Sequence, residues 1–483
     1  MSSHIEVERA FSPDPDGDLP DLTEVAGVVA VEPAGEAALD ATYYDVPGLP
    51  LLRSGVTLRR RTGGSDEGWH LKLPGAGDES RTEVHEGLDH AEVPESLARL
   101  VAGWTRGLQP APVARIRTHR QTSRLVGVDG AVLAEVADDR VEGQAAQLGS
   151  EPKRWREWEV ELVHGGPALL DDVTAFLADR GVRPSEVQRK IIVVLGQPER
   201  PAPGPASKKG PARLLLHRWI VDQVGEIERL DPVVRQADDG GVHGMRKACR
   251  RLRAALGTCR PLVDRDSTDP IREELRWLAR SLGSARDDEV VVARLERLLR
   301  DQDCDVTAAR QVLERHAAVR AAEDEAVLGE TMCSQRYFEL RTALDRLAAE
   351  PPWTSTADDK ARDVLPGLVA KEWKRVRRRH RDGVDPHEVR KAVKRMRYAY
   401  ELVEPVWGSA RKPRRAARTM TKILGDRQDT IVAREWLVTM ASDGATGEAG
   451  FVFGRVHAQE EVHEVALLQR AATEWRRLKS VRW

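Results

Sequence analysis

The 483-residue sequence has few cysteines and no long apolar run. Its four cysteines, Cys249, Cys259, Cys304 and Cys333, lie far apart and form no Cys-x-x-Cys pair, which argues against a disulfide framework and against a structural zinc site. No apolar run approaches the roughly 18 residues that a membrane-spanning helix needs. The first residues are charged, so no secretory signal is expected. We therefore expect a soluble, cytoplasmic protein with reduced cysteines.

Charge is distributed unevenly along the chain. Residues 1–211 carry 34 Asp and Glu against 24 Lys and Arg, whereas residues 212–483 carry 44 against 52. The net charges of -10 and +8 add up to the overall charge of -2. A chain of this length usually exceeds one hydrophobic core, so two or three domains are expected. The asymmetry indicates that the two halves handle charged partners differently.

A proline-rich segment separates these halves. Residues 198–211 contain five prolines and two glycines, a composition that disfavours helix and strand, so we predict a linker between domains at 1–197 and 212–483. Before it, short alternating segments predict the strands of a closed antiparallel sheet. These segments are Ile5–Phe11, Val56–Arg61, Trp69–Leu73, Arg81–His85, Arg115–Arg124, Ala131–Ala137 and Trp155–Leu162. After it, a 3.6-residue period predicts helices throughout. The predicted fold is α+β and multidomain.

The helical half contains a duplicated basic segment. Basic residues follow two histidines at the same offsets of 3, 4, 7, 8 and 10 positions. The first set is His243, Arg246, Lys247, Arg250, Arg251 and Arg253, and the second is His387, Arg390, Lys391, Lys394, Arg395 and Arg397. At about 100° per residue these offsets cover one broad face of a helix, while apolar residues cover the opposite face. Each segment therefore predicts a helix with a buried stripe and a cationic face.

Such a face is commonly solvated and paired with nearby carboxylates. Across the two 11-residue segments, however, Glu388 is the one acidic residue, so the like charges are expected to repel one another without local neutralisation. An external polyanion would remove this cost. A third basic run from Lys371 to Arg381 would enlarge the cationic surface.

The duplication continues downstream. Arg276, Arg280, Leu282, Gly283 and Asp287 match Arg418, Lys422, Leu424, Gly425 and Asp429 in spacing and mostly in type, which predicts repeats at about 212–350 and 360–483. This pattern resembles a CHAD domain. The resemblance implies an all-α duplicated bundle that binds inorganic polyphosphate. The residues it carries over are His243, Arg246, Lys247, Arg250, Arg253 and Arg280 with His387, Arg390, Lys391, Lys394, Arg397 and Lys422.

Charged residues in the predicted strands recur at a spacing of two, which places them on one face. Examples are Glu6 with Glu8, Arg59 with Arg61, and a run of Glu157, Glu159 and Glu161. In an ordinary sandwich such residues face water. In a barrel of about eight strands they can face inward and form a polar lumen. Arginines there would bind phosphate oxygens, and carboxylates would bind Mg²⁺ or Mn²⁺.

The order of these elements resembles a CYTH domain, the triphosphate tunnel fold. The residues that carry the resemblance are Glu6-Val7-Glu8, Tyr44-Asp45, Leu58-Arg59-Arg60-Arg61, Lys72, Arg81-Thr82-Glu83, Arg115-Ile116-Arg117, Glu159-Val160-Glu161 and Lys190. The resemblance implies an eight-stranded antiparallel tunnel in which Glu6, Glu8, Glu159 and Glu161 bind metal. It also implies that Arg59, Arg61 and Lys72, with Arg81, Arg115, Arg117 and Lys190, bind triphosphate, and that Glu6, Glu8, Arg59, Arg61 and Lys72 act in catalysis.

The sequence departs from this family most informatively in the opening motif, and more mildly at His85, where an acid is common, and at Arg115, where a lysine is common. The opening motif of the family is Glu-x-Glu-x-Lys, and Ala10 stands where the lysine is expected. Arg9 is adjacent but would face the other way on a regular strand. This departure bears on the catalytic rate more than on the fold.

Two classes of function follow, and a third is ranked below them. The first is a cytoplasmic enzyme, associated with polyphosphate granules, whose helices bind polyphosphate and whose tunnel hydrolyses triphosphate or a polyphosphate end with Mg²⁺ or Mn²⁺. The second is a polyphosphate-binding protein with a tunnel that binds without efficient turnover, which Ala10 favours. Nucleic acid is third because the duplicated segments have few aromatic residues for stacking on bases.

Overall fold

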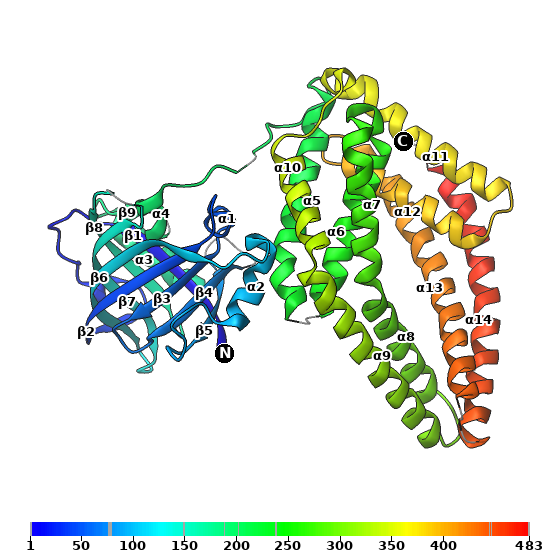
Figure 1. Cartoon of the computed structure of the whole chain (residues 1–483), viewed down its shortest axis with the longest axis horizontal. Helices are drawn as coiled ribbons and strands as arrows, with labels where there is room; N and C mark the ends of the chain where they lie inside the picture. Colours follow the sequence, from blue (N-terminus) through cyan, green and yellow to red (C-terminus); the bar gives the residue numbers. More distant parts are fainter. Residues whose placement is uncertain are drawn as a thin grey trace. The chain divides into compact units, whose positions relative to one another are not determined.

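The computed structural model describes residues 2–75, 80–147, 150–187, 189–200, 202–236, 239–443, 445 and 447–481, without the side chains of residues 2, 3, 239 and 284–287. The chain forms two compact units, Met1–Arg200 and Pro201–Trp483 (Figure 1). The division lies in the proline-rich segment. Each unit has its own hydrophobic clusters.

Within the described residues, the first unit is a closed antiparallel barrel, which confirms the predicted fold class. Its strands are β1 (Ser2–Ser12), β2 (Val28–Asp45), β3 (Thr57–Thr62), β4 (Gly68–Pro74), β5 (Ser80–Glu86), β6 (Ala111–Gly127), β7 (Val132–Ala145) and β8 (Lys153–Leu162). The sheet order runs β5-β4-β3-β2-β6-β7-β8-β1, and β1 also pairs with β5, which closes the ring. The short β9 (Arg183–Pro184) pairs with the end of β1.

The strand β2 is absent from the strands predicted above, although it is the longest in the barrel. Its sequence contains Pro33, Gly35 and several alanines, residues that are uncommon in strands. Register shifts in its pairing with β6 at Pro33/Gly35 and Tyr43/Tyr44 further interrupt its alternation. Pairing with β3 and β6 on its two sides stabilises β2 where its own composition does not.

Helices cover the barrel on its outside and fill one part of its inside. On the outside, α3 (Pro167–Ala178) packs on a cluster that includes Phe11 and Trp158, and α1 (Pro50–Arg53) and α2 (Glu95–Thr105) pack on a cluster around Trp69. The short α4 (Lys190–Leu195) contributes Ile191, Ile192 and Val194 to a cluster with side chains of β2, β6 and β7. Because α4 begins at Lys190, this packing brings a lysine to the lumen.

The second unit is helical, as its apolar periodicity predicts. Its helices are α5 (Ala212–Arg235), α6 (Asp239–Thr258), α7 (Arg265–Ser281), α8 (Gly283–Arg300), α9 (Thr307–Cys333), α10 (Gln335–Ala349), α11 (Ala361–Arg381), α12 (Pro386–Val403), α13 (Arg411–Ser442) and α14 (Gly447–Ser480). The helix pairs α8 with α9 and α13 with α14 extend away from the rest of this unit (Figure 1) and share one hydrophobic cluster. Among the described helices, none combines the length and the apolar character that crossing a bilayer requires.

The duplicated segments occupy corresponding places in the helix order. The first basic segment lies on α6 and the second on α12, and these helices contact each other. Downstream, the first copy breaks at Leu282 between α7 and α8, whereas α13 continues without interruption through Leu424 and Gly425. The two copies also begin side by side, since Pro211 and Lys360 form a β-bridge.

Candidate functional site

The barrel encloses a charged lumen. Its lining residues are Glu6, Glu8, Leu39, Ala41, Tyr43, Thr57, Arg59, Arg61, Asp66, Lys72, Arg81, Glu83, Ile116, Thr118, Arg120, Glu159, Glu161, Arg189, Lys190 and Ile191. The apolar members come mainly from β2, β6 and α4, and the charged members come from β1, β3, β4, β5, β6 and β8, from the turn after β3 and from the start of α4. Strand alternation explains the set, because every second side chain of each strand points inward.

The cations of the lumen are crowded. Arg59 and Arg61 extend from β3, and burial followed by the like charges of Arg59 and Arg120 lowers the pKa of Arg61 to about 9. At α4, burial and then the charges of Arg81 and Arg200 lower the pKa of Arg189 to about 10. Burial is the first cause of both shifts, and the neighbouring like charges add to it, so these arginines lie close to other cations, which is the electrostatic setting of an anion site.

Carboxylates line the same lumen from β1 and β8. Glu8 is directly paired in register with Glu161, and burial followed by the charge of Glu8 raises the pKa of Glu161. Lys72 contacts Glu6 at 2.5 Å and Glu8 at 4.0 Å. Facing carboxylates that repel one another bind a divalent cation well, because hard cations prefer several oxygen ligands. The structure thus brings the four predicted metal ligands, Glu6, Glu8, Glu159 and Glu161, into one lumen.

A second carboxylate group surrounds Lys190. The Lys190 Nζ lies 2.5 Å from Glu159 and 3.0 Å from Asp139, and it also contacts Glu157. Arg120 bridges Asp139 and Glu159, with both contacts at 2.6 Å. Asp139, Glu157 and Glu159 offer oxygens close enough to one another for a metal ion.

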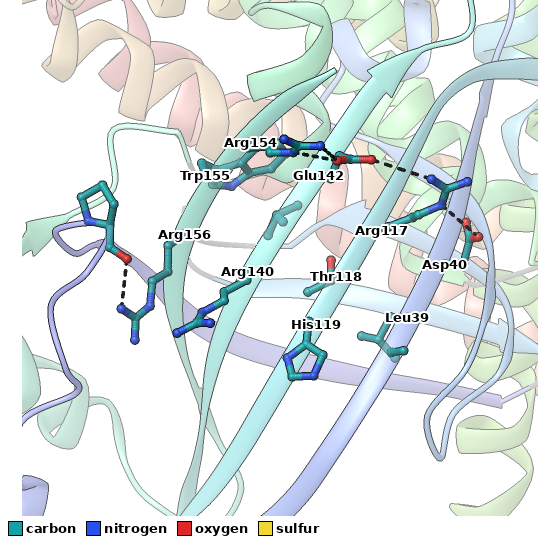
Figure 2. A pocket seen from close by; sticks show the side chains of 13 residues that line it. Leu39, Asp40, Arg117, Thr118, His119, Arg140, Glu142, Arg154, Trp155 and Arg156 are labelled. Carbon is teal, nitrogen blue, oxygen red and sulfur yellow. Dashed lines mark hydrogen bonds and ion pairs between the residues drawn. The ribbon is translucent and has the colours of Figure 1, made fainter. Parts of the chain in front are cut away.

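The predicted positions of Arg115 and Arg117 are wrong. Their side chains are 56% and 58% exposed on the outer face of β6, where Arg115 binds Asp40 and Arg117 lies 3.7 Å from both Asp40 and Glu142. Figure 2 shows Arg117 between these two acids, in a groove on the outside of the barrel. The inward residues of β6 are Ile116, Thr118 and Arg120. Shifting a strand by one residue exchanges the side chains on its two faces, and the resemblance alone did not determine which residues of β6 face inward.

Charged residues of the lumen that are missing from the predicted site include Glu83, Arg120 and Arg189, and Asp139 lies beside them in contact with Arg120. Glu83 shares a strand face with Arg81, so the spacing of two could have identified it. Arg120 and Asp139 are cross-strand partners on β6 and β7. Their signal was weaker because each follows apolar or small residues on its own inward face. Arg59, Arg61, Lys72, Arg81 and Lys190 all lie in the lumen, as expected.

The residues around position 10 lie as the strand alternation predicts. Ala10 is buried and faces Glu159 across the β1–β8 pair. Arg9 points to the outside and donates hydrogen bonds to the Leu170 carbonyl and to Thr174 on α3, which confirms the predicted orientation. The ammonium of Lys190 therefore contacts the carboxylate of Glu159, which lies opposite Ala10, the position where the family has a lysine.

The predicted residues of the helical unit lie along α6, α7, α12 and α13. His243, Lys247, Arg280, Lys391 and Lys422 are exposed, and Arg250, Arg253, His387, Arg390, Lys394 and Arg397 are half-buried. Arg246 is buried and donates a 2.8 Å hydrogen bond to the Gly283 carbonyl. In the second copy, Arg390 lies beside Gly425. The Leu-Gly motif is thus placed next to the first basic residue in both copies. The side chain of Asp287 lies outside the described residues.

Neutralisation of the basic faces differs from the prediction. Glu401 lies 2.9 Å from Arg251 and 3.7 Å from Arg397, and Lys391 binds Glu388. The expected lack of neutralisation is therefore wrong for these residues, because α6 and α12 pack together and share a carboxylate from the end of α12. Around Arg253 the cations remain crowded, since burial and then the charges of Arg276 and Arg272 lower its pKa.

Comparison with known proteins agrees with both units. Residues 4–187 match the CYTH domain and residues 220–438 match the CHAD domain. MT2285, an uncharacterized protein of Mycobacterium tuberculosis, is 35% identical over 492 residues, covering 95% of this chain and 93% of that protein. Human thiamine-triphosphatase is 43% identical over 72 residues, 15% of this chain and 28% of that protein.

A solved structure, PptA from Streptomyces chartreusis, covers 55% of this chain and 99% of its own, with 21% identity and a TM-score of 0.47. The charged barrel is a triphosphate tunnel, and the chain belongs to the family of proteins in which a CYTH domain is followed by a CHAD domain.

Proposed function

We propose that this protein binds inorganic polyphosphate on its helical unit and hydrolyses inorganic triphosphate or a polyphosphate end in its tunnel. The observation that carries the proposal is the meeting of crowded arginines and facing carboxylates in one lumen. Such a site can bind a phosphate chain through its cations and a divalent metal ion through its oxygens. We place this activity in the cytoplasm, at polyphosphate granules.

The donor set fits Mg²⁺ or Mn²⁺. Glu8 and Glu161 face each other, and Glu6 and Glu159 extend from the same strand faces. A bound divalent ion would supply charge neutralisation for the phosphates and a more acidic water. The protein itself would hold the phosphate chain. Arg59, Arg61, Arg81 and Arg120 line the lumen and can bind phosphoryl oxygens, and Lys72 lines the same lumen and contacts Glu6.

Polyphosphate binding by the second unit is supported by the paired basic faces of α6 and α12. The cations around Arg253 include Arg272, Arg276 and Arg280 from α7, which places basic residues of two helices within one electrostatic cluster. A flexible polyanion can contact both helices, and it gains affinity by releasing counterions.

The second candidate is a polyphosphate-binding protein with little or no turnover. The observation that favours it is Ala10, because this position faces Glu159 without a charge of its own. Nucleic acid binding stays third, for the reason given by the composition of the basic helices.

Phosphate release by the full-length chain tests the tunnel. Triphosphate, ATP, thiamine triphosphate and long-chain polyphosphate are supplied with Mg²⁺ or Mn²⁺, and the doubly substituted Glu6→Gln/Glu8→Gln chain is compared with the native chain. Turnover should disappear in this variant and in excess chelator. The matched control is Asp40→Asn/Glu142→Gln, which removes two carboxylates that are paired with Arg115 and Arg154 on the outside of the barrel. Turnover that survives the lumen substitutions would exclude the tunnel mechanism.

A further inference from the structure

A histidine joins the carboxylates at one end of the lumen. His4 and Glu6 extend from the same face of β1, and His4 pairs in register with Glu83 on β5. The His4 Nε2 lies 3.6 Å from Glu6 Oε1 and 3.5 Å from Glu83 Oε2. These ligand atoms could hold one metal ion between them. The resemblance to the tunnel family assigns no role to His4.

The distances from His4 to the two carboxylates are compatible with a metal site. Distances of 3.5 and 3.6 Å exceed those of normal N–H···O hydrogen bonds. They match the edges of a tetrahedron around an ion with bonds of about 2.1 Å, which are roughly 3.4 Å long. The His4 nitrogen thus already stands near the separation from each carboxylate oxygen that tetrahedral coordination requires, and all three atoms lie within 4.8 Å of one another.

Each carboxylate is also oriented from its other oxygen. Glu83 Oε1 lies 2.9 Å from His70 Nδ1, and Glu6 Oε2 lies 2.5 Å from Lys72 Nζ. The second ring nitrogen of His70 lies 2.9 Å from the Asp66 carbonyl, which fixes the ring. Partners of this kind hold metal ligands in place and contribute to affinity. The oxygens that face His4 are therefore positioned rather than mobile.

The ligand types indicate which ion fits. A neutral imidazole nitrogen with two carboxylates suits Zn²⁺, Co²⁺ or a related transition metal, whereas Mg²⁺ prefers oxygens in an octahedral arrangement. Glu6 and Glu83 are 6% and 4% exposed, while the His4 side chain is 55% exposed. Because the His4 side chain is accessible to solvent, an ion can reach the site from solution, and a water molecule can occupy the fourth coordination position.

We propose that His4, Glu6 and Glu83 form a three-ligand site for Zn²⁺ or a similar transition metal ion, distinct from the all-carboxylate site around Glu8 and Glu161. Because Glu6 belongs to both groups, an ion at the His4 site withdraws Glu6 from the other. The structure thus assigns this end of the tunnel a transition-metal site that competes with the Mg²⁺ or Mn²⁺ site.

Cobalt absorption tests the site directly. The full-length chain is titrated with Co²⁺ in a Cys333→Ser background, which removes the exposed thiol. We expect one Co²⁺ per chain with the intense visible absorption of tetrahedral cobalt, which Zn²⁺ then displaces. His4→Ala should abolish this absorption, and His70→Ala should weaken affinity about tenfold or more.

His119→Ala is the matched control, because His119 is also 55% exposed with a carboxylate 3.8 Å away but faces the outside of β6. The control should bind Co²⁺ as the native chain does. Equal absorption in the native and His4→Ala chains, or its absence from the native chain, would overturn the proposal and leave His4 as a partner in an ion pair. The same holds if His119→Ala loses the absorption.

A second measurement concerns competition and rests on the proposed hydrolysis. Low concentrations of Zn²⁺ should inhibit Mg²⁺-dependent phosphate release by the native chain and inhibit His4→Ala at least about tenfold less. Equal inhibition of both chains would contradict competition through Glu6. If the native chain releases no phosphate, the proposed hydrolysis fails, while the cobalt titration still decides whether the metal site exists.

Discussion

Arg117 and Arg120 lie three positions apart on β6 and have opposite surroundings. Arg120 is half-buried in the lumen, where it bridges Asp139 and Glu159, whereas Arg117 is exposed on the outside beside Asp40. A guanidinium already oriented by two carboxylates loses little freedom when it binds a phosphate. The difference in position therefore predicts a difference in function.

We expect Arg120→Ala to lower kcat/KM for triphosphate by roughly a hundredfold, the scale seen when one charge-stabilising donor is removed from an active site. Arg117→Ala should leave kcat/KM within about twofold. Steady-state phosphate release measures both. Since Arg120→Ala leaves Asp139 without one partner, Arg120→Lys serves as a second variant that keeps the charge and should retain more activity. Equal effects of Arg117→Ala and Arg120→Ala would contradict the assignment of β6.

Lys190 and Ala10 meet at Glu159. The ammonium of Lys190 binds the carboxylate that faces Ala10, so α4 supplies a charge where β1 lacks one. We expect Lys190→Ala to lower turnover by about tenfold or more. Adding Ala10→Lys to that variant should restore part of the loss, while Ala10→Lys alone should not raise turnover, because it adds a like charge next to Lys190. Comparison of kcat across the four chains checks this, and an increase in the single variant would show that Lys190 does not replace the missing lysine.

Glu6 makes the stability of the barrel depend on pH. Burial, followed by its hydrogen bond with Glu83, raises the pKa of Glu6 from 4.5 to about 8. The folded state therefore retains a proton that the unfolded state loses above about pH 4.5, so the contribution of Glu6 is fully present below that pH and is lost as pH rises through about 8.

In metal-free buffer, we expect the unfolding temperature to fall between pH 5.5 and 8.5 more in the native chain than in Glu6→Gln. The corresponding difference between the two chains in the free energy of unfolding should not exceed about 1.4 kcal/mol per pH unit. Scanning calorimetry of both chains measures it. Identical pH dependence would mean that the carboxyl of Glu6 titrates normally.

At the scale of elements, α6 and α12 present the same basic face from corresponding places in the two repeats. Charges at three and four positions fall on one side of a helix, and apolar residues such as Met245 and Met396 are fully buried on the other. Each helix can therefore contact a polyanion without losing its packing. The repeat therefore predicts that both helices contribute to polyphosphate binding.

We expect Arg246→Glu/Arg250→Glu and Arg390→Glu/Lys394→Glu each to weaken polyphosphate binding at least about tenfold. Arg246 is buried against Gly283, so Lys247→Glu/Arg250→Glu provides a variant of the first helix that leaves this packing intact. The control is Arg470→Glu/Arg476→Glu, which changes two exposed arginines of α14. Calorimetric titration with long-chain polyphosphate measures all four. Unchanged affinity in the α6 and α12 variants would indicate that the basic faces are solvated surfaces and do not bind polyphosphate.

At the scale of the whole molecule, acidic and basic charge are separated between the two units. The net charge of residues 212–483 is +8 although the chain as a whole is slightly acidic. Polyphosphate affinity should therefore fall steeply with salt, because each neutralised phosphate releases a counterion. Double-stranded DNA of equal charge should compete poorly, since a stiff duplex cannot follow basic residues that lie on several helices. Titrations at increasing salt, with and without DNA, check both expectations, and efficient competition by DNA would favour a nucleic-acid protein.

The sequence by itself determined the helical unit and much of the barrel. The 3.6-residue period fixes which side of α6 and α12 is basic, because the face of a helix follows from local spacing alone. The spacing of two likewise grouped Glu6 with Glu8 and Arg59 with Arg61. Local spacing was insufficient for β2, where Pro33, Gly35 and several alanines obscure a strand that its neighbours stabilise.

Only the tertiary structure decided which strand face forms the lumen and which distant residues meet there. Alternation separates two faces but does not say which one is inside, so Arg115 and Arg117 were placed on the wrong side of β6. Closure of the ring pairs β1 with both β5 and β8, which brings Glu6 to Glu83 and Glu8 to Glu161. Packing of α4 delivers Lys190 to Glu159. These contacts join residues far apart in the chain, and their geometry depends on strand register and helix packing rather than on any local pattern.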